Sequence, residues 1–188
     1  MKIELYTPHW HREVLKLMAN LSGEHHFVNL GQLAAQPNVV LLLSYENEKE
    51  LAGFTQGRLL SPGGLREHLE YRIGEISPEI DQADRDGVLG VIETVAVAPA
   101  FRRRGIARKL LEILHDKLIG MGADKLIITF KRGPSASNVD GLMTQLGFAP
   151  WTRLPSYWKE RCENRDFLCV DWDGTCKCEA SLYRKTVL

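Results

Sequence analysis

Three residues, Arg102, Gly105 and Ala107, have types and spacing that suit the binding of a phosphorylated ligand. They stand where a β-branched run changes into a helical pattern, so the chain around them should form the first turn of a helix. The N–H groups of such a turn lack intrahelical partners and carry partial positive charge, which favours an anion. Gly105 and Ala107 also leave the backbone open to a bulky phosphate. We therefore predict an anion-binding turn, against the alternative of a basic, solvated helix start.

The arginines of this turn support the same prediction. Arg102, Arg103 and Arg104 would lie beside the positive end of a helix, which is unfavourable for cations unless something negative is bound. Neither Gly-x-Gly-x-x-Gly nor Gly-Lys-Ser/Thr occurs here, so a dinucleotide-binding or P-loop site is less well supported.

The spacing Arg-x-x-Gly-x-Ala, preceded by Val-x-Pro at residues 97–99, resembles motif A of the GNAT superfamily of acyl-coenzyme-A-dependent N-acyltransferases. In that family the turn wraps the pyrophosphate of coenzyme A, and Arg102, Gly105 and Ala107 occupy its three defining positions. The resemblance is strongest over residues 88–131. It implies that the coenzyme is bound by Arg102, Arg103, Arg104, Gly105, Ile106 and Ala107.

The same resemblance implies the fold. It is an α/β fold with a mixed, mostly antiparallel sheet of seven strands, flanked by about four helices. Two neighbouring parallel strands splay apart, and the pantetheine arm of the coenzyme enters the gap and forms hydrogen bonds like an extra strand. Backbone contacts are expected at Val95 and Val97, although both residues also suit a plain sheet core.

The segment from Asn138 to Phe148 matches the family in part. Asn138 and Leu146-Gly147-Phe148 resemble a family pattern, and the resemblance places Asn138 at the coenzyme. The position four residues before Gly147, where the family often has a Tyr as general acid, is Met143. No catalytic Tyr is therefore assigned, and Tyr157 and Tyr183 are candidate substitutes that the sequence does not place.

Glu93 is the best candidate for a general base, acting directly or through water. It is a carboxylate within an otherwise apolar strand beside the predicted cleft, and burial would raise its pKa toward a value useful for deprotonating an amine. The alternative is that Glu93 only forms an ion pair, with an Arg as its partner.

Four histidines near the N-terminus offer a second source of a base or of acceptor-pocket residues. They are His9, His11, His25 and His26. Each one by itself is more typical of a surface or capping histidine, and the two that flank residue 10 lack the i, i+4 spacing of two ligands on one helix face.

The cysteines all follow residue 160 and form the pattern Cys-x₆-Cys-x₆-Cys-x-Cys. The segment reads as two strand arms, 167–172 and 175–183, joined by an Asp-Gly turn. Pairing around that turn places Cys169 opposite Cys178 and puts Cys176 on the same side, with Cys162 approaching from the preceding loop. A zinc or iron site, a disulfide or redox pair, and packed free thiols all remain open, because paired Cys-x₂-Cys units are missing.

Residue patterns predict the elements that position these groups. A helix–loop–helix with apolar stripes should follow the first strand, and an insertion should lie near the acceptor side. Strands are predicted at 3–6, 39–45, 51–60, 88–98 and 126–130, helices at about 8–22, 30–36, 103–120 and 137–145, the insertion at about 62–87, and a Cys-rich hairpin at about 160–180. One GNAT domain over residues 1–188 is expected.

Composition limits the partners. Lys plus Arg equals Asp plus Glu at 24 each, so no overall field recruits nucleic acid, and no run approaches the length of a membrane span. The absence of a signal-peptide pattern makes a cytoplasmic location the default expectation. Nucleic-acid binding through the three arginines is a further alternative, disfavoured by the zero net charge.

The sequence thus predicts an N-acetyltransferase that moves an acetyl group from acetyl-CoA directly to a primary amine. The acceptor is a small molecule or a protein amino group. The alternative is a non-catalytic regulatory or sensor protein that binds coenzyme A on the same scaffold. The oligomeric state is left open, a homodimer included.

Overall fold

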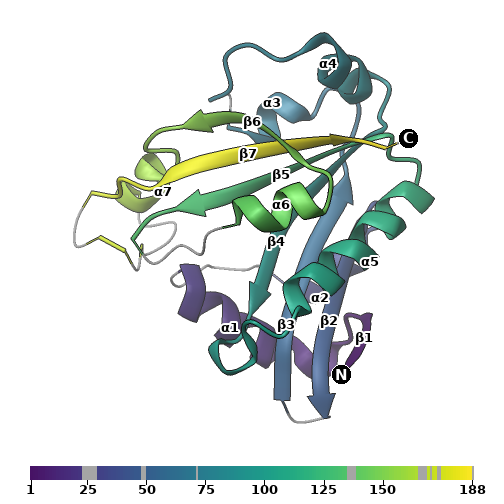
Figure 1. Ribbon diagram of the computed structural model, residues 1–188, viewed down its shortest axis with the longest axis vertical. Helices are drawn as coiled ribbons and strands as arrows, with labels where there is room; N and C mark the ends of the chain where they lie inside the picture. The colour runs from purple at the N-terminus through teal and green to yellow at the C-terminus, as the bar shows by residue number, and fades with distance from the viewer. Residues whose placement is uncertain are drawn as a thin grey trace.

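A seven-stranded mixed sheet organises the molecule (Figure 1). The computed structural model describes residues 1–22, 29–47, 50–70, 72–134, 139–164, 169, 171–172 and 175–187. The sheet order is β1-β2-β3-β4-β5-β7-β6, and only β4 and β5 pair in parallel. The strands are β1 Lys2–Leu5, β2 Val39–Asn47, β3 Glu50–Leu59, β4 Leu89–Val97, β5 Lys125–Arg132, β6 Ala149–Leu154 and β7 Glu179–Thr186. This architecture confirms the predicted fold class.

The helices of the described residues are mostly short, and only α1, α4 and α5 have eight or more residues. They are η1 Pro8–Trp10, α1 His11–Ser22, α2 Leu30–Ala34, α3 Leu65–His68, α4 Pro78–Arg85, η2 Pro99–Phe101, α5 Ile106–Gly120, α6 Asp140–Gln145 and α7 Lys159–Glu163. No helix in the described part of the chain has the length and apolarity needed to cross a bilayer.

The parallel pairing of β4 and β5 stops part-way along both strands. Its last partners are Ile92 and Ile128. Beyond them, residues 129–132 of β5 pair with β7, and residues 94–97 of β4 pair with β3. Figure 1 shows the two strands separating toward their carboxyl ends. The splay that the family resemblance implied is therefore present.

Helix α5 connects the two parallel strands and covers one face of the sheet. Its leucines at 110, 111, 114 and 118 are fully buried, as their spacing predicts. The helix approaches closely because β3 has glycines beneath it: a Cβ at Gly57 would lie 3.2 Å from Leu114 and 2.7 Å from the carbonyl oxygen of Val91. The position of α5 thus fixes the turn at the end of β4 that the sequence predicts to bind an anion.

The opposite face is covered by α1 at one end and by α3 and α4 at the other. In β2, Val40 and Leu42 pack on the α5 side, while Leu41 and Leu43 pack against α1. This strand is therefore buried on both faces, as its continuous apolar run predicted. Apolar side chains of α3 and α4 pack on β4 and β5, so the insertion is part of the core and not a loose lid.

The last strands differ from the prediction in two places. The described residues of the expected arm 167–172 are Cys169, Asp171 and Trp172, and none lies in a strand, so that assignment was wrong. The sheet instead contains β6, a strand that the sequence did not predict and that pairs with β7. The second arm begins at Glu179 and not at residue 175. The Asp-Gly turn at 173–174 lies outside the described residues.

Candidate functional site

The turn between β4 and α5 has a backbone that only a few residue types tolerate. Gly105 adopts φ 77° and is the N-cap of α5, with no side chain that caps the helix. Arg103 also has a positive φ of 64°. A Cβ added at Gly105 would meet nothing within 4 Å, so the space in front of the helix is open. The free N–H groups of the first turn therefore face an accessible surface.

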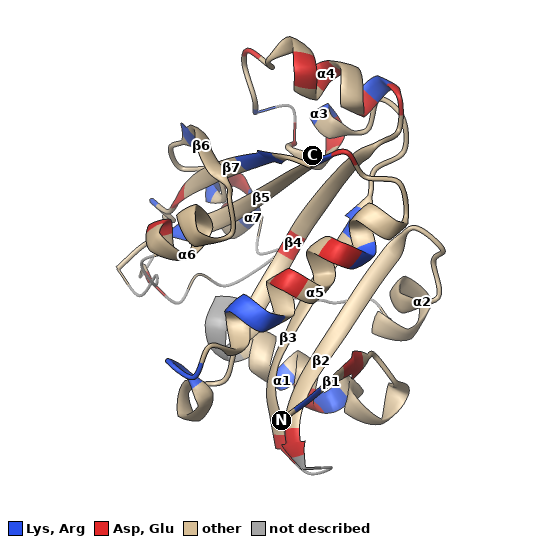
Figure 2. Cartoon of the chain, turned by 45° about the vertical axis from the view of Figure 1, so that its right-hand side comes forward, with Lys and Arg blue, Asp and Glu red and all other residues tan. Residues whose placement is uncertain are grey.

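The side chains of the turn differ in what they contact. The Nε of Arg102 donates to the carbonyl oxygen of Val97 at 3.3 Å, while Arg104 forms an ion pair with Glu46 at 3.1 Å and stacks over Phe101. Ile106 is buried, so only its backbone is available to a ligand. Figure 2 shows the basic residues before α5 and in its first turn. The turn therefore combines free backbone N–H groups with the positive charge of its arginines.

The edge of β4 that faces the gap offers backbone groups. On one edge of β4, Val95 is paired with Thr55 of β3 and Val97 with Gly53 of β3. Their side chains pack against the α5 core cluster. The other edge of this half of β4 has no strand paired to it among the described residues. An extended ligand can therefore add to β4 as a further strand would.

Glu93 sits at the point where the strands separate. Gln56 pairs with Thr94 and Gly57 with Ile92, so Glu93 is the extra residue of a β-bulge in β4. Glu93 is also the only charged residue of this strand (Figure 2). The bulge turns its carboxylate toward Gln56, on the face of the sheet opposite α5.

The Glu93 carboxylate is held by two side chains of β3. Its Oε1 lies 2.5 Å from Nη2 and 2.8 Å from Nε of Arg58, and its Oε2 accepts a hydrogen bond from Gln56. The Glu93 side chain is 13% exposed, so it is largely buried yet still accessible. The ion pair that the sequence analysis weighed as an alternative is thus present. Arg58 and Gln56 fix the direction of the carboxylate.

His68, the last residue of α3, lies beside this carboxylate. Its Nδ1 is 3.9 Å from Oε1 of Glu93. Burial lowers the pKa of His68 below its ordinary value; the negative charge of Glu93 opposes this shift and that of Arg58 adds to it. The imidazole is therefore largely neutral at pH 7 and able to accept a proton. Helix α3 is anchored nearby, since Asp84 of α4 accepts the N–H of Leu65 at 3.0 Å.

Tyr183 lies on β7, on the side of the α5 core. Its hydroxyl donates to Asp140 and accepts a hydrogen bond from Nη2 of Arg132 at 2.8 Å. Burial raises the pKa of Tyr183, and the hydrogen bond to Asp140 adds to the increase. These three residues border a pocket of about 330 Å³ next to β6. Tyr157, just before α7, is buried among apolar side chains of α3, α4 and the central strands, and burial raises its pKa to about 12.

Comparison with known proteins identifies the family. The family model described as "Acetyltransferase (GNAT) family" matches residues 4–148, well over half of the 188 residues. The chain belongs to the GNAT family. No curated protein matches it in sequence. The match covers the helix–loop–helix, the splayed strands, α5 and α6, and it ends before the cysteines.

Solved GNAT-fold structures resemble the chain over its whole length. They include a ribosomal-protein-alanine N-acetyltransferase from Brucella melitensis, with 16% identity, a TM-score of 0.64 and 100% coverage of both chains. A Bacillus subtilis acetyltransferase in complex with CoA has 16% identity, a TM-score of 0.64 and coverage of 100% and 99%. A putative acetyltransferase from Salmonella typhimurium with its cofactor acetyl-CoA has 14% identity, a TM-score of 0.64 and coverage of 100% and 94%. Identities this low show the fold alone.

Within this GNAT fold, Met143 is completely buried in the α5 core cluster. Its thioether has no proton to donate, so Met143 cannot serve as a general acid. Asn138, which the family resemblance places at the coenzyme, lies outside the described residues. His25 and His26 lie outside them as well.

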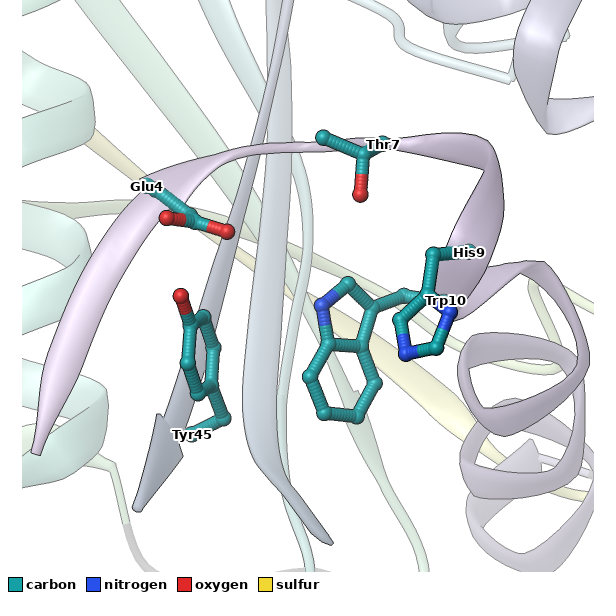
Figure 3. Close-up of a pocket in the computed structure, with 5 residues that line it drawn as sticks. All are labelled: Glu4, Thr7, His9, Trp10 and Tyr45. Atoms are coloured by element: carbon teal, nitrogen blue, oxygen red, sulfur yellow. The ribbon is translucent and has the colours of Figure 1, made fainter. Parts of the chain in front are cut away.

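His9 and His11 are near the first strand of the GNAT fold. His9 lines a pocket of about 290 Å³ together with Glu4, Thr7, Trp10 and Tyr45, and Figure 3 shows the Tyr45 hydroxyl directed toward Glu4. The Nδ1 of His11 lies 3.1 Å from the hydroxyl of Tyr6. Neither histidine joins the group around Glu93.

The four cysteines come together at the carboxyl end of β5. The sulfurs of Cys169 and Cys178 are 3.6 Å apart, which confirms the juxtaposition expected from the sequence. Burial raises the pKa of Cys162 to about 12. Burial would also raise the pKa of Cys176, but hydrogen bonds from the Cys178 N–H and from neighbouring thiols outweigh it and lower that pKa.

Sequence analysis missed His68 and Arg58 as parts of the site. Their signals were weak: His68 lies in the polar insertion, and Arg58 reads as an ordinary residue near the end of a strand. One feature of the sequence did indicate a role for Arg58. It stands two residues after Gln56 on the strand expected to pair with β4, so its positive side chain could reach a carboxylate on that strand.

Proposed function

We propose that this GNAT protein is an N-acetyltransferase that moves the acetyl group of acetyl-CoA directly to a primary amine. One observation carries the proposal: three features lie next to one another along β4. They are the open basic turn at residues 102–107, the β4 edge beyond Ile92 that no described strand pairs with, and the largely buried carboxylate of Glu93 where that edge begins. One strand and the turn after it thus offer a place for the diphosphate, the pantetheine arm and the reacting amine.

The coenzyme would lie along β4. The N–H groups from Gly105 to Ala107 and the nearby arginines would bind the pyrophosphate, with Arg102, Arg103 and Arg104 supplying charge. The pantetheine amides would pair with the peptide groups of Val95 and Val97. Asn138 stays a predicted contact.

The reaction needs a neutral amine. Glu93 would take the proton of the ammonium substrate, directly or through water, while Arg58 and Gln56 hold the carboxylate in place. The amine nitrogen then attacks the thioester carbonyl, the C–S bond breaks with its electron pair on sulfur, and the nitrogen releases its remaining extra proton to solvent, which leaves a neutral amide. The neutral imidazole of His68, 3.9 Å from Glu93, would receive the proton next through a bridging water.

The leaving group makes a modest demand on the protein. A coenzyme thiol has a pKa near that of an ordinary thiol, about 8.5, so its thiolate is a good leaving group near neutral pH. It can take a proton from water. This is consistent with a buried Met143 at the position where the family often has a Tyr. Most of the rate enhancement would come from holding the two substrates together.

The direct test is to incubate the purified protein with acetyl-CoA and a panel of primary amines, and to measure the release of free coenzyme thiol. We expect binding of acetyl-CoA by calorimetry and amine-dependent release with at least one acceptor class, small or peptidic. An absence of heat from acetyl-CoA would overturn the proposal. Binding without release for every amine would favour the sensor alternative, for which the missing Tyr is the supporting observation.

A further inference from the structure

The four cysteines are brought together from three separate segments. Cys162 belongs to α7, Cys169 lies seven residues further along the chain, and Cys176 and Cys178 precede β7. The sulfurs of Cys162, Cys169 and Cys176 all lie within 4.8 Å of one another. Cys178 joins the group through its 3.6 Å separation from Cys169. All four cysteines of the chain therefore lie in one place, which packing of free thiols alone would not require.

The separations are those of a metal site and not of a disulfide. A disulfide needs sulfurs about 2.05 Å apart. Four thiolates at the usual Zn–S bond length of about 2.3 Å form a tetrahedron whose edges are about 3.8 Å. The Cys169–Cys178 separation of 3.6 Å already matches such an edge. The sulfurs form two overlapping groups that share Cys169, with Cys162 and Cys176 in one and Cys178 in the other, so metal binding would draw Cys178 toward the first group.

The surroundings fit bound thiolates. Cys176 and Cys178 are fully buried, and the backbone N–H of Cys178 donates to the sulfur of Cys176 at 3.4 Å. Such N–H···S bonds orient a metal-bound sulfur as outer-shell partners do. Gly133 gives the cluster room, because a Cβ there would lie 3.0 Å from the sulfur of Cys178.

Asp171 is the competing ligand in this cluster. Its Oδ2 lies 3.7 Å from the sulfur of Cys178, but it also forms an ion pair with Lys131 at 2.6 Å. A carboxylate held by a lysine ammonium is a poorer metal ligand than a thiolate, and soft zinc or iron sites favour sulfur. Asp171 is therefore a neighbour that the lysine neutralises.

We propose that Cys162, Cys169, Cys176 and Cys178 bind one Zn²⁺ in a closed structural site. The four thiols lose their protons to solvent as four Zn–S bonds form, and no oxidation is involved. With four protein ligands no position remains for a substrate, so the metal stabilises structure and does not take part in acyl transfer.

The site would hold α7 close to the segment that carries His68. The N–H of Tyr157, just before α7, donates to the carbonyl of Cys178 at 3.1 Å. Arg161 of α7 forms an ion pair with Glu70 at 3.3 Å, and Glu70 is two residues from His68. Zinc would thereby connect the end of the sheet to the segment that carries the histidine beside Glu93.

The test uses the full chain, purified without chelator. Elemental analysis should find one zinc per chain, and Co²⁺ in its place should give the charge-transfer and d–d absorption of a tetrahedral tetrathiolate. Removal of zinc should expose four titratable thiols. Cys169→Ser, at the centre of the cluster, should weaken zinc binding by more than the roughly 10- to 100-fold that loss of an outer-shell partner costs. Thr175→Ala, an exposed neighbour, is the matched control and should keep its metal.

Several outcomes would overturn the proposal. They are four thiols that titrate in the native protein while added zinc and cobalt fail to bind, an iron chromophore in place of zinc, or a Cys169–Cys178 disulfide in peptide mass analysis. If Cys169→Ser does not fold, the wild-type metal content and cobalt spectrum still decide. Acetyl-CoA calorimetry on the wild-type protein is independent of all of these measurements, so this proposal and the proposed function can fail separately.

Discussion

Arg58 and Glu93 form a nearly buried ion pair at the bulge where β4 leaves β5, with both Nε and Nη2 of the guanidinium directed at one carboxylate oxygen. The other oxygen of Glu93 accepts from Gln56. This arrangement fixes the direction of the carboxylate. It therefore suits both a structural ion pair and a base that receives a proton from a substrate ammonium.

Glu93→Gln separates these two roles. The amide keeps the size of the side chain but cannot take a proton, so kcat should fall by about 100- to 10,000-fold with little change in KM for acetyl-CoA. Steady-state kinetics with saturating amine measures this. Asp81→Asn, an exposed acid paired with Arg85, is the control and should leave kcat unchanged. If the Gln variant keeps kcat within about tenfold, Glu93 is only the partner of Arg58.

His68 should make stability depend on pH. Burial lowers its pKa in the folded chain below the unfolded value of about 6.5. The unfolded chain then binds more protons, so the free energy of unfolding should decrease as the pH falls through 6.5, by at most about 1.4 kcal/mol per pH unit.

Urea unfolding between pH 5 and pH 8 tests this expectation. His68→Gln should flatten the slope below about pH 6.5, whereas His9→Gln, at an exposed position, should not. An unchanged slope in the first variant would show that another group titrates. A direct NMR titration of the His68 ring should also give a midpoint below that of an exposed histidine.

The elements with strong local signals were predictable from the sequence. The leucine spacing of α5 and the apolar run of β2 each determine one dominant burial pattern, and the structure contains both. Helix α5 begins at Ile106 and not near Arg103, because Arg103 and Gly105 adopt positive φ and the 3-10 turn η2 precedes them. The family resemblance supplied the splay, which no periodicity encodes.

The rest depended on tertiary contacts. Strand β6 carries Pro150 and alternates poorly, so its pairing with β7 decides its conformation. Helix α4 lies in an acidic segment, where only Ile80 and Ala83 are buried apolar residues. The group at Glu93 combines side chains of β3, α3 and β4, which lie far apart in the sequence. The β-bulge that brings them together is a change in the pairing of β3 with β4, so the sequence of either strand alone does not predict it.

Tyr183→Phe tests whether this tyrosine protonates the leaving thiolate. The hydroxyl already donates to Asp140, so we expect the turnover rate to change by less than about tenfold. The bond from Tyr183, and then the one from Arg132, lowers the pKa of Asp140. The Asp140 carboxylate therefore stabilises the fold at pH values above its ordinary pKa of about 3.9. This contribution is lost as the pH falls through the pKa of Asp140 in the folded chain.

In Tyr183→Phe the Asp140 pKa should rise toward its ordinary value, as a carboxyl NMR titration would show. Thr144→Ala, which removes a hydroxyl from the same pocket, is the control. If turnover instead slows by about 100-fold or more while acetyl-CoA affinity stays the same, Tyr183 is the general acid.

A pair of glycine substitutions at the two ends of α5 isolates the anion site. Gly105 and Gly122 have φ of 77° and 104°, and a Cβ at either meets nothing within 4 Å. Each change to Ala should therefore cost about 1–2 kcal/mol of stability from left-handed strain. Only Gly105→Ala places a methyl group where the pyrophosphate would dock, so calorimetry should find coenzyme A affinity about tenfold or more weaker in that variant alone. Equal coenzyme A affinities in the two variants would place the diphosphate away from this turn, because each variant carries strain at one end of α5 and only Gly105→Ala adds a methyl group at the proposed site.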